Sequence, residues 1–350
     1  LPRGNGKFHG GPAYYIKNAL HQPGVAKLFA LLISVTFGLV YVSVQANTIA
    51  LSAQTIGIDP AITAAFLCIF TALVICGGMH RIAKVTEFLV PIMAGLYLLV
   101  ALVIILLHLS EVPAMFALIF HDAFSPQAAV GGGLGTAMIT GIKRGLFSNE
   151  AGEGSVPNAA ATAAVTHPVK QGLVQSFGVY VDTWIVCSAT AFIILLTGQY
   201  TIGGECTGIA LAQASLASVF GSLAPAAVSL MILLFAFSSI VGNYYYGEIN
   251  IAFFDGNTRR YLAVFRVCVV LMVLFGSLAT LQLVWNLADL FMGFLCLTNL
   301  YAVLRLSKYA RIALFDYVKQ KREGHKEPTF DPAILGDEDG VHAWGVDKIK

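Results

Sequence analysis

Long apolar stretches separated by short polar segments dominate this sequence. A helix needs roughly 20 apolar residues to cross the hydrocarbon core of a bilayer. This length criterion predicts eight membrane spans, near Ala26 to Ile56, Pro60 to Cys76, Val85 to His108, Pro126 to Ala164, Gly172 to Leu196, Ser222 to Phe254, Leu262 to Ala279 and Val284 to Leu306. The fourth is long and interrupted. We therefore expect an N-terminal segment over residues 1–25, a membrane domain over 26–306 and a tail over 307–350.

The positions of Lys and Arg predict the orientation of these spans, because basic loops stay on the cytoplasmic side. If the spans alternate, nearly all basic residues fall on one side, and the opposite loops carry only acidic charges, at Asp59, Glu111, Asp122 and Glu205. We expect both chain ends on the basic, cytoplasmic side. An amphipathic segment, Val112 to Phe124, is expected along the outer surface. The charged tail from about Ser307 predicts a cytoplasmic, partly disordered segment.

Composition supports a protein dissolved in lipid. Apolar residues make up 57% of the chain and charged residues 11%, which is typical of an all-α polytopic membrane protein. A net charge of +2 gives no reason to expect a nucleic-acid partner. The six cysteines lack metal-ligand spacing and mostly lie in apolar runs, so we interpret them as helix-packing residues. No cofactor is predicted.

Polar side chains recur inside the predicted spans, where an unpaired polar group costs several kcal/mol. They follow helical spacing in the first and fifth spans and cluster in the sixth and eighth: Gly38, Tyr41, Gln45, Thr48 and Ser52; Gln171, Gln175, Gly178 and Asp182; Ser238, Ser239 and Asn243; Asn286 and Asp289. Small and hydroxylated residues are commonly contacts between packed helices. A carboxamide or carboxylate, as at Gln45, Asp182 or Asn243, is harder to satisfy by packing, and a solute pathway would give it a partner.

The fourth span predicts a broken helix, because Gly145, Gly152, Gly154 and Pro157 disfavour a continuous one. Irregular backbone at membrane depth survives only where it lines a cavity. A half-helix that resumes near Ser155 would present free N–H groups to an anion such as a carboxylate, and unwound carbonyls could coordinate a cation.

The basic pair Lys143 and Arg144 leaves two readings of this break open. If the break lies at mid-membrane, the pair lies deeper than a cytoplasmic loop, and Glu150 or Glu153 would be its natural ion-pair partner. If the pair lies at the surface, the break is a loop and the binding argument weakens. Soluble-enzyme signatures such as GxSxG, HExxH and a P-loop are missing from the sequence. An intramembrane enzyme that uses Asp182 and Asp289 is disfavoured, because these carboxylates lie on different spans.

With these motifs identified, the chain resembles the alanine or glycine:cation symporter family, also called sodium:alanine symporters or amino acid carrier proteins. The resemblance covers nearly all of residues 10–306. It is carried by GGPAYYI (10–16), SVQANTIA (43–50), GLFSNEAGEGSVPNAAATA (145–163), HPVKQGL (167–173), FAFSSIVGNYYYGE (235–248) and VWNLADLFMG (284–293). The FSNEAG block is highly specific.

The resemblance implies a leucine-transporter-like fold of two inverted five-helix repeats, in which the solute binds where the first helix of each repeat is broken. On that plan the spans here are core helices three to ten, and the broken span is core helix six. Because the chain opens on Leu1 and the repeats are lopsided, we expect core helices one and two to be missing from it.

The same resemblance implies residue roles and an activity. Gln45, Phe147, Ser148, Asn149 and Asn243 are expected to contact substrate, although some family members carry Trp at the position of Asn243, which leaves the pocket's preference open. Ser238 and Ser239 are expected to hold Na⁺. Asp182, Glu150, Lys143 and Arg144 are candidates for the pathway.

We expect symport of a small neutral amino acid, alanine or glycine, with Na⁺ or H⁺ across the plasma membrane by alternating access. A channel or sensor built on the same helices and an inactive fragment are the alternatives. The choice among alanine, glycine, serine and glutamine, the ion stoichiometry and the oligomeric state stay open at this point.

Overall fold

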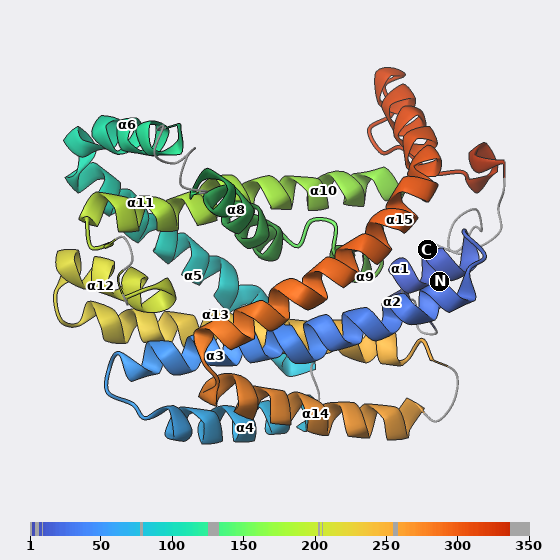
Figure 1. Cartoon of the computed structure of the whole chain (residues 1–350). Helices are drawn as coiled ribbons and strands as arrows, with labels where there is room; N and C mark the ends of the chain where they lie inside the picture. The colour runs from blue at the N-terminus through green and yellow to red at the C-terminus, as the bar shows by residue number, and fades with distance from the viewer. Residues whose placement is uncertain are drawn as a thin grey trace.

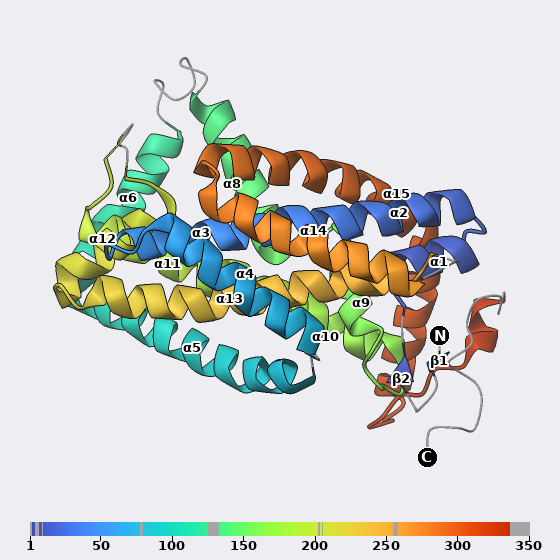
Figure 2. The same cartoon turned by 90° about the horizontal axis from the view of Figure 1, so that it is seen from below.

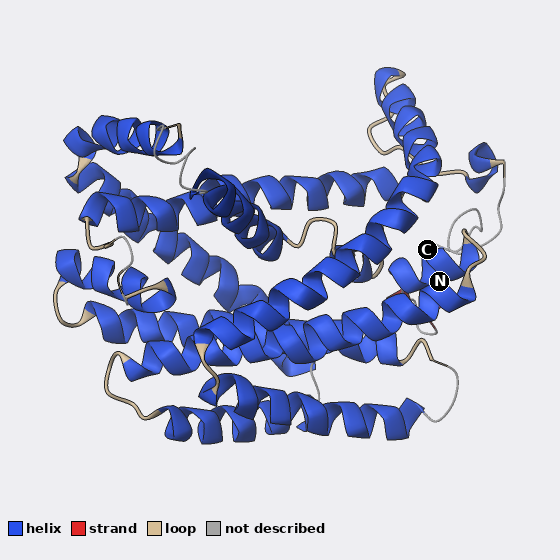
Figure 3. Ribbon diagram, viewed as in Figure 1, coloured by secondary structure: helices blue, strands red, loops and turns tan. Residues whose placement is uncertain are grey.

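A computed structural model of the chain describes residues 2–3, 7–8, 10–77, 80–124, 133–201, 204, 206–254 and 258–336. The start of the predicted fourth span, Glu205 and the last 14 residues lie outside this part. Apart from a pairing of two-residue strands, β1 (Pro2–Arg3) with β2 (Lys7–Phe8), the described residues form helices and their connections (Figure 3).

The helices follow in chain order and are interrupted by short π-helical or 3₁₀ segments. They are α1 (Pro12–Asn18), α2 (Pro23–Val35), η1 (Thr36–Tyr41), α3 (Val42–Gln54), α4 (Pro60–Gly77), α5 (His80–Leu107), η2 (Leu109–Glu111), α6 (Val112–Ala123), α8 (Gly133–Asn149), α9 (Val156–Ala160), α10 (Pro168–Tyr180), η3 (Val181–Cys187), α11 (Ser188–Thr197), α12 (Gly208–Phe220), α13 (Ala224–Ile251), α14 (Thr258–Leu278), α15 (Leu281–Arg322) and η4 (Pro332–Leu335).

Within the described residues, six helical stretches are long and apolar enough to cross a membrane: Pro23–Gln54, Val90–Leu107, Pro168–Thr197, Ala224–Ile251, Thr258–Leu278 and Leu281–Arg322. Each corresponds to one predicted span. The second predicted span is the shorter apolar helix Pro60–Cys76, and the fourth contains α8 and α9. The chain is therefore an all-α polytopic membrane protein, as the sequence predicts. Helix α12 was not predicted, since its 13 residues are too few to register as a span.

The bundle is built around α3 and α13, which lie side by side and share α14 as a neighbour, while α4 packs on α14 (Figures 1 and 2). One apolar core joins α2, η1 and α15 through Phe29, Phe37 and Leu295. A second joins α3 with α13 and α14 through residues such as Ile240 and Val269. The end of α8 packs against the first of these cores through Leu146 and Phe147.

The helix α1 and the far end of α15 lie at the same end of the bundle, and α6 and α12 lie at the opposite end (Figure 1). The segment Val112 to Phe124, expected to be amphipathic, forms α6 over all but its last residue. Pro113 stands in the first turn of this helix, where a missing N–H group is tolerated.

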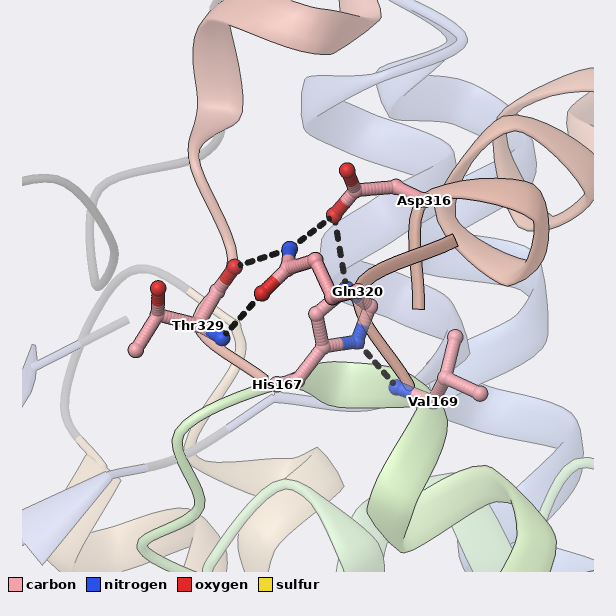
Figure 4. A network of polar contacts seen from close by, with 5 residues as sticks. All are labelled: His167, Val169, Asp316, Gln320 and Thr329. Carbon is pink, nitrogen blue, oxygen red and sulfur yellow. Dashed lines mark hydrogen bonds and ion pairs between the residues drawn. The ribbon is translucent and has the colours of Figure 1, made fainter. Parts of the chain in front are cut away.

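The segment after Leu306, predicted to be charged and partly disordered, begins as helix. Helix α15 continues to Arg322, because residues 307–322 are rich in strong helix formers such as Leu, Ala, Lys and Arg. The chain then turns back onto the start of α10, where the backbone N–H of Phe330 donates to the carbonyl of Thr166 at 3.0 Å. The carboxamide of Gln320 bonds both the N–H and the C=O of Thr329, at 2.9 and 2.8 Å (Figure 4).

His167 is the centre of this polar network. Its Nδ1 accepts a hydrogen bond from the backbone N–H of Val169 at 3.2 Å and so caps α10, and its Nε2 lies 3.3 Å from the carboxylate of Asp316 on α15 (Figure 4). Its imidazole is fully buried. The network therefore ties the end of α15 to the beginning of α10. We call residues 316–330 together with His167 the tail clasp.

Candidate functional site

The predicted helix break is present between α8 and α9. Helix α8 ends at Asn149 and helical structure resumes at Val156, next to the predicted Ser155. Three residues in the break have left-handed backbone, Glu150 (φ 54°), Gly152 (φ 88°) and Gly154 (φ 83°). Gly145 lies inside α8, so the glycines that act as breakers are the two that need positive φ. Glu150 is the strained member, because a side chain in this region costs about 1–2 kcal/mol.

Side chains from three other helices hold the broken backbone. Asn299 of α15 donates from Nδ2 to the carbonyl of Gly152 at 2.8 Å and accepts from the hydroxyl of Tyr15 at 2.7 Å. Asn158 donates to the carbonyl of Gly154 at 2.8 Å, and Asn250 of α13 donates to Asn158 at 3.2 Å. Both asparagines at the centre, Asn158 and Asn299, are buried, so these bonds form away from water.

These contacts correct part of the prediction made for the break. Two of the carbonyls that were expected to face a solute are occupied by the chain's own amides. The resumed helix α9 has only five residues, too few to build the dipole on which an anion site at a helix N-terminus depends. Solute binding at the break must therefore rely chiefly on side chains.

A cavity of about 420 Å³ lies beside the break. Its walls come from η1, α3, α8, the break and α13, and its lining residues are Tyr41, Gln45, Phe147, Ser148, Glu150, Ser239, Gly242, Asn243 and Tyr246. Four of the five residues expected to contact substrate line it, and one of the two expected to hold Na⁺. Segments separated by up to about 200 residues of sequence therefore meet here, as the resemblance implied.

Asn149 is the expected substrate residue that does not line the cavity. Its Nδ2 donates to the hydroxyl of Thr183 on η3 at 3.1 Å, and its Oδ1 accepts from the backbone N–H of Ala151 at 2.9 Å. Asp182, also on η3, accepts a hydrogen bond of 2.6 Å from the hydroxyl of Ser148. These residues tie the break to η3, and only Ser148 among them reaches the cavity.

The two serines proposed for a cation occupy neighbouring positions on α13. The hydroxyl of Ser238 donates to the carbonyl of Phe235 at 2.7 Å, and that of Ser239 donates to the same carbonyl at 3.2 Å. A hydroxyl that donates to its own helix keeps its oxygen lone pairs for another partner. Hard cations take such oxygen ligands. Ser239 lines the cavity and Ser238 does not, so the geometry favours Ser239 as the residue beside the solute.

Lys143 and Arg144 do not pair with Glu150 or Glu153, the partners expected if the break lies at mid-membrane. Both reach Asp289 of α15 instead: Nζ of Lys143 lies 3.3 Å from Oδ2, and a guanidinium nitrogen of Arg144 contacts Oδ1. Arg144 also lies over the ring of Trp285, 4.0 Å from its centroid. These side chains reach Asp289 because both project from α8, before the break, on the side of the helix that faces α15.

An aromatic series connects this ion pair to the break. The rings of Trp285 and Phe147 are 4.6 Å apart, and those of Phe147 and Tyr41 are 4.7 Å apart. Sequence reasoning placed Tyr41 on the polar face of its helix but assigned it no role, and it missed Tyr246. A signal for Tyr41 existed in its spacing of four residues from Gln45, which puts both on one face of a helix. Tyr246 carries the same kind of signal, since it stands seven residues after Ser239 and three after Asn243, but the run of three tyrosines obscures it.

The π-helical segment η1 ends at this site, and the π-helical segment η3 lies beside it. Tyr41 is the last residue of η1, and Asp182 lies in η3. A π-helical turn inside an α-helix leaves backbone irregular and is often found at functional sites. In this chain η1 places Tyr41 in the cavity, and η3 places Asp182 next to Ser148 of the cavity. Local sequence patterns did not predict these two π-helical segments.

Comparison with known proteins places the chain in a family. The sodium:alanine symporter family matches residues 2–332. The chain is 46% identical over 344 residues to a probable sodium/glutamine symporter, GlnT, of Bacillus subtilis, covering 98% of this chain and 71% of that protein. It is 43% identical over 342 residues to the amino-acid carrier protein AlsT of Bacillus subtilis, covering 97% and 72%.

A more distant relative comes from an archaeon. The sodium/alanine symporter AgcS of Methanococcus maripaludis is 38% identical over 314 residues, which cover 87% of this chain and 68% of that protein. The match to the family extends over the break, the cavity walls on α3 and α13, and the tail clasp. On this evidence the chain belongs to the sodium:alanine symporter family.

Proposed function

We propose that this chain carries out sodium-coupled symport of a small neutral amino acid across the plasma membrane by alternating access, with both chain ends on the cytoplasmic side. The observation that carries the proposal is the cavity at the helix break, where amide and hydroxyl groups of Gln45, Ser148, Ser239 and Asn243 converge on one space. The printed names of relatives, which include sodium/glutamine and sodium/alanine symporters, support the same class of substrate and ion.

The chemistry of the lining suits a zwitterionic solute of modest size. Gln45 and Asn243 each offer both donors and acceptors, which match the ammonium and carboxylate groups of an amino acid. Phe147 and Tyr246 supply apolar ring surface for its side chain. Ser238 and Ser239, whose hydroxyl hydrogens are used within α13, present oxygen atoms to Na⁺.

Coupling requires that Na⁺ bind one conformation better than the other, because a ligand shifts an equilibrium only by its differential affinity. A cation on Ser239 would lie in the same cavity as the solute. Binding of each would then favour the same arrangement of the break, and the two affinities would rise together by the same factor.

The test is uptake of labelled alanine by proteoliposomes that contain the protein, under an inward Na⁺ gradient and under a matched K⁺ gradient. We expect accumulation only with Na⁺. Ser239→Ala should raise the Na⁺ concentration needed for half-maximal uptake at least tenfold. Ser307→Ala is the matched control, because Ser307 makes the same bond to its own helix, to the carbonyl of Leu304 at 2.8 Å, but lies on the exposed end of α15.

Equal uptake in both gradients, together with an unchanged Na⁺ dependence in Ser239→Ala, would reject the assignment of the cation. Flux that equilibrates without accumulation would instead favour a channel.

The preference between alanine and glutamine is tested by competition between the two. Asn243→Trp fills part of the cavity and should weaken glutamine more than alanine, because the larger side chain needs the lost space.

A further inference from the structure

The two carboxyl groups at the helix break have no cationic partner within the described part of the chain. The ion pairs there place Lys143 and Arg144 on Asp289, Arg266 on Glu248 and Lys170 on Glu327. Glu150 and Glu153 appear in none of them. Two neighbouring carboxylates without a cation are disfavoured, since a buried charge loses its hydration and the two repel each other.

Glu153 is the deeper of the two. Its side chain is completely buried, its Oε2 accepts a hydrogen bond of 2.9 Å from the hydroxyl of Tyr41, and its Oε1 is buried with no hydrogen-bond partner among the described residues. Glu150 is only partly buried, lines the cavity and accepts a bond from the hydroxyl of Ser155 at 2.5 Å. The break therefore contains one carboxyl that the cavity reaches and one that lies behind it.

The groups that face this pair from the surrounding helices are neutral or acidic. They are Tyr41 from η1, Tyr246 from α13, Cys296 from α15 and Asp182 from η3. Asp182 adds negative charge on the side of Glu150. None of the described groups that face the pair therefore supplies a positive charge.

The surroundings of Glu153 favour a proton over a metal ion. A metal ion needs several oxygen ligands that converge on one point, whereas the buried Oε1 has no hydrogen-bond partner among the described residues. No group of three or more His, Cys, Asp or Glu residues able to hold a metal ion occurs in the described residues. A proton needs only one oxygen, and it removes the charge that burial penalises.

We propose that Glu150 and Glu153 form a proton-binding site that holds one proton at neutral pH, carried on Oε1 of Glu153. The proton comes from water and returns to water, and its binding converts the Glu153 carboxylate to a carboxylic acid while Oε2 keeps the hydrogen bond from Tyr41. Glu150 lines the cavity beside it. This site is separate from the serines proposed for Na⁺, although its effect on uptake rests on the proposed function.

The consequence for transport follows from the position of Glu153 in the break. Loss of the proton would leave two charges in the segment that Asn158 and Asn299 hold together. The protonated form is therefore the one in which the break keeps its observed shape. Uptake should decline above the pH at which the site loses its proton, by about tenfold per pH unit, because occupancy of a single proton site falls at that rate.

The direct test is infrared spectroscopy of the purified protein in lipid, since a carboxylic acid has a C=O stretching band that a carboxylate lacks. We expect this band at pH 7, its loss as the pH is raised, and its absence in Glu153→Gln. Glu150→Gln should retain it. The control Glu111→Gln changes an exposed residue at the start of α6 and should retain it as well.

Three results would overturn the proposal. The first is a spectrum of the unaltered protein without the band at pH 7, and the second is a band that persists in Glu153→Gln. The third is loss of the band when NaCl is added at constant pH, which would assign the pair to a metal cation. None of these spectra depends on transport. The proton site can therefore be rejected while sodium-driven uptake is confirmed, and sodium-driven uptake can be rejected while the proton site is confirmed.

The pH profile of uptake in proteoliposomes supplies the second measurement. The unaltered protein and Glu111→Gln should show the alkaline decline, and Glu153→Gln should lose it, because a carboxamide mimics the neutral acid at every pH. A flat profile in the unaltered protein, or the same decline in Glu153→Gln, would contradict the assignment even if the variant folds normally.

Discussion

Arg144 and Asp289 form an ion pair across 145 residues of sequence, between the last turns of α8 and the third turn of α15. The arginine is 35% exposed and the aspartate 19%, and the guanidinium also covers Trp285. The pair therefore joins the helix that breaks to the helix whose Asn299 holds the break. It is a contact through which opening of the cavity could be linked to movement of α15.

Removal of this pair should destabilise the protein through a measurable coupling. Arg144→Ala and Asp289→Ala should each lower the free energy of unfolding, and the double variant should lose less than their sum, with a coupling of about 1–2 kcal/mol. Thermal unfolding in detergent checks this. Lys143→Ala is the matched control, because Lys143 is 46% exposed and a pair at the surface contributes about 0–1 kcal/mol. Strict additivity of the two single variants would contradict the prediction.

Gly154 should not tolerate a side chain. A Cβ there would lie 2.8 Å from Oδ1 of Asn299 and 2.9 Å from the Phe29 ring, and the backbone φ of +83° disfavours any residue except glycine. We expect Gly154→Ala to cost about 2–4 kcal/mol from strain and overlap together.

Gly141 offers the comparison for this experiment. It lies inside α8, and a Cβ there would meet nothing within 4 Å. Gly141→Ala should be neutral or stabilising by about 0.5–1 kcal/mol, because alanine loses less conformational entropy in a helix than glycine. Equal unfolding temperatures for the two variants would show that the break is not held as the structure describes.

Asn299 should be required as an amide and not only as an acceptor. Asn299→Asp keeps an oxygen for the hydroxyl of Tyr15 but removes the donor to the carbonyl of Gly152. We expect a loss of about 1–3 kcal/mol, the cost of a buried polar group without its partner. Hydrogen exchange at residues 150–155 should rise in this variant. Tyr15→Phe, which leaves the bond to Gly152 intact, should have a smaller effect at the break.

The tail clasp should weaken at acidic pH. Burial lowers the pKa of His167 below its usual value, although the carboxylate of Asp316 opposes the shift. Between the ordinary pKa of about 6.5 and the lower folded value, the unfolded chain binds more protons than the folded one. The contribution of His167 to stability is therefore complete above the ordinary pKa and is lost as the pH falls through this window.

Limited proteolysis of the segment after Arg322, at a series of pH values from 5 to 8, measures this. We expect cleavage to accelerate at the acidic end. His167→Asn keeps a side-chain acceptor at the start of α10, as asparagine is a good cap, but it cannot titrate and should flatten the profile. An identical acid response in this variant would assign the effect to another group.

Much of the fold was determined by local features of the sequence. Apolar length alone located most of the helices, since a span must cover the hydrocarbon. Gly152 and Gly154 located the break to within a few residues, because their conformations are properties of glycine itself. The end of α15 and the helix α12 escaped prediction for the converse reason: neither has the apolar length of a membrane span, which is the signal that located the other helices.

The site divides in the same way. The sequence by itself determined which residues were out of place in a membrane. Gln45, Ser239 and Asn243 stood out because an isolated polar group at that depth demands a partner, whereas Ser148 was named only through the family resemblance. Only the tertiary structure decided which residue each polar or charged side chain contacts. In the structure, Lys143 and Arg144 form ion pairs with Asp289 on α15, and Glu153 accepts a hydrogen bond from Tyr41. Such pairs between helices depend on how the packed helices are oriented, and the spacing of residues within one helix does not contain that information.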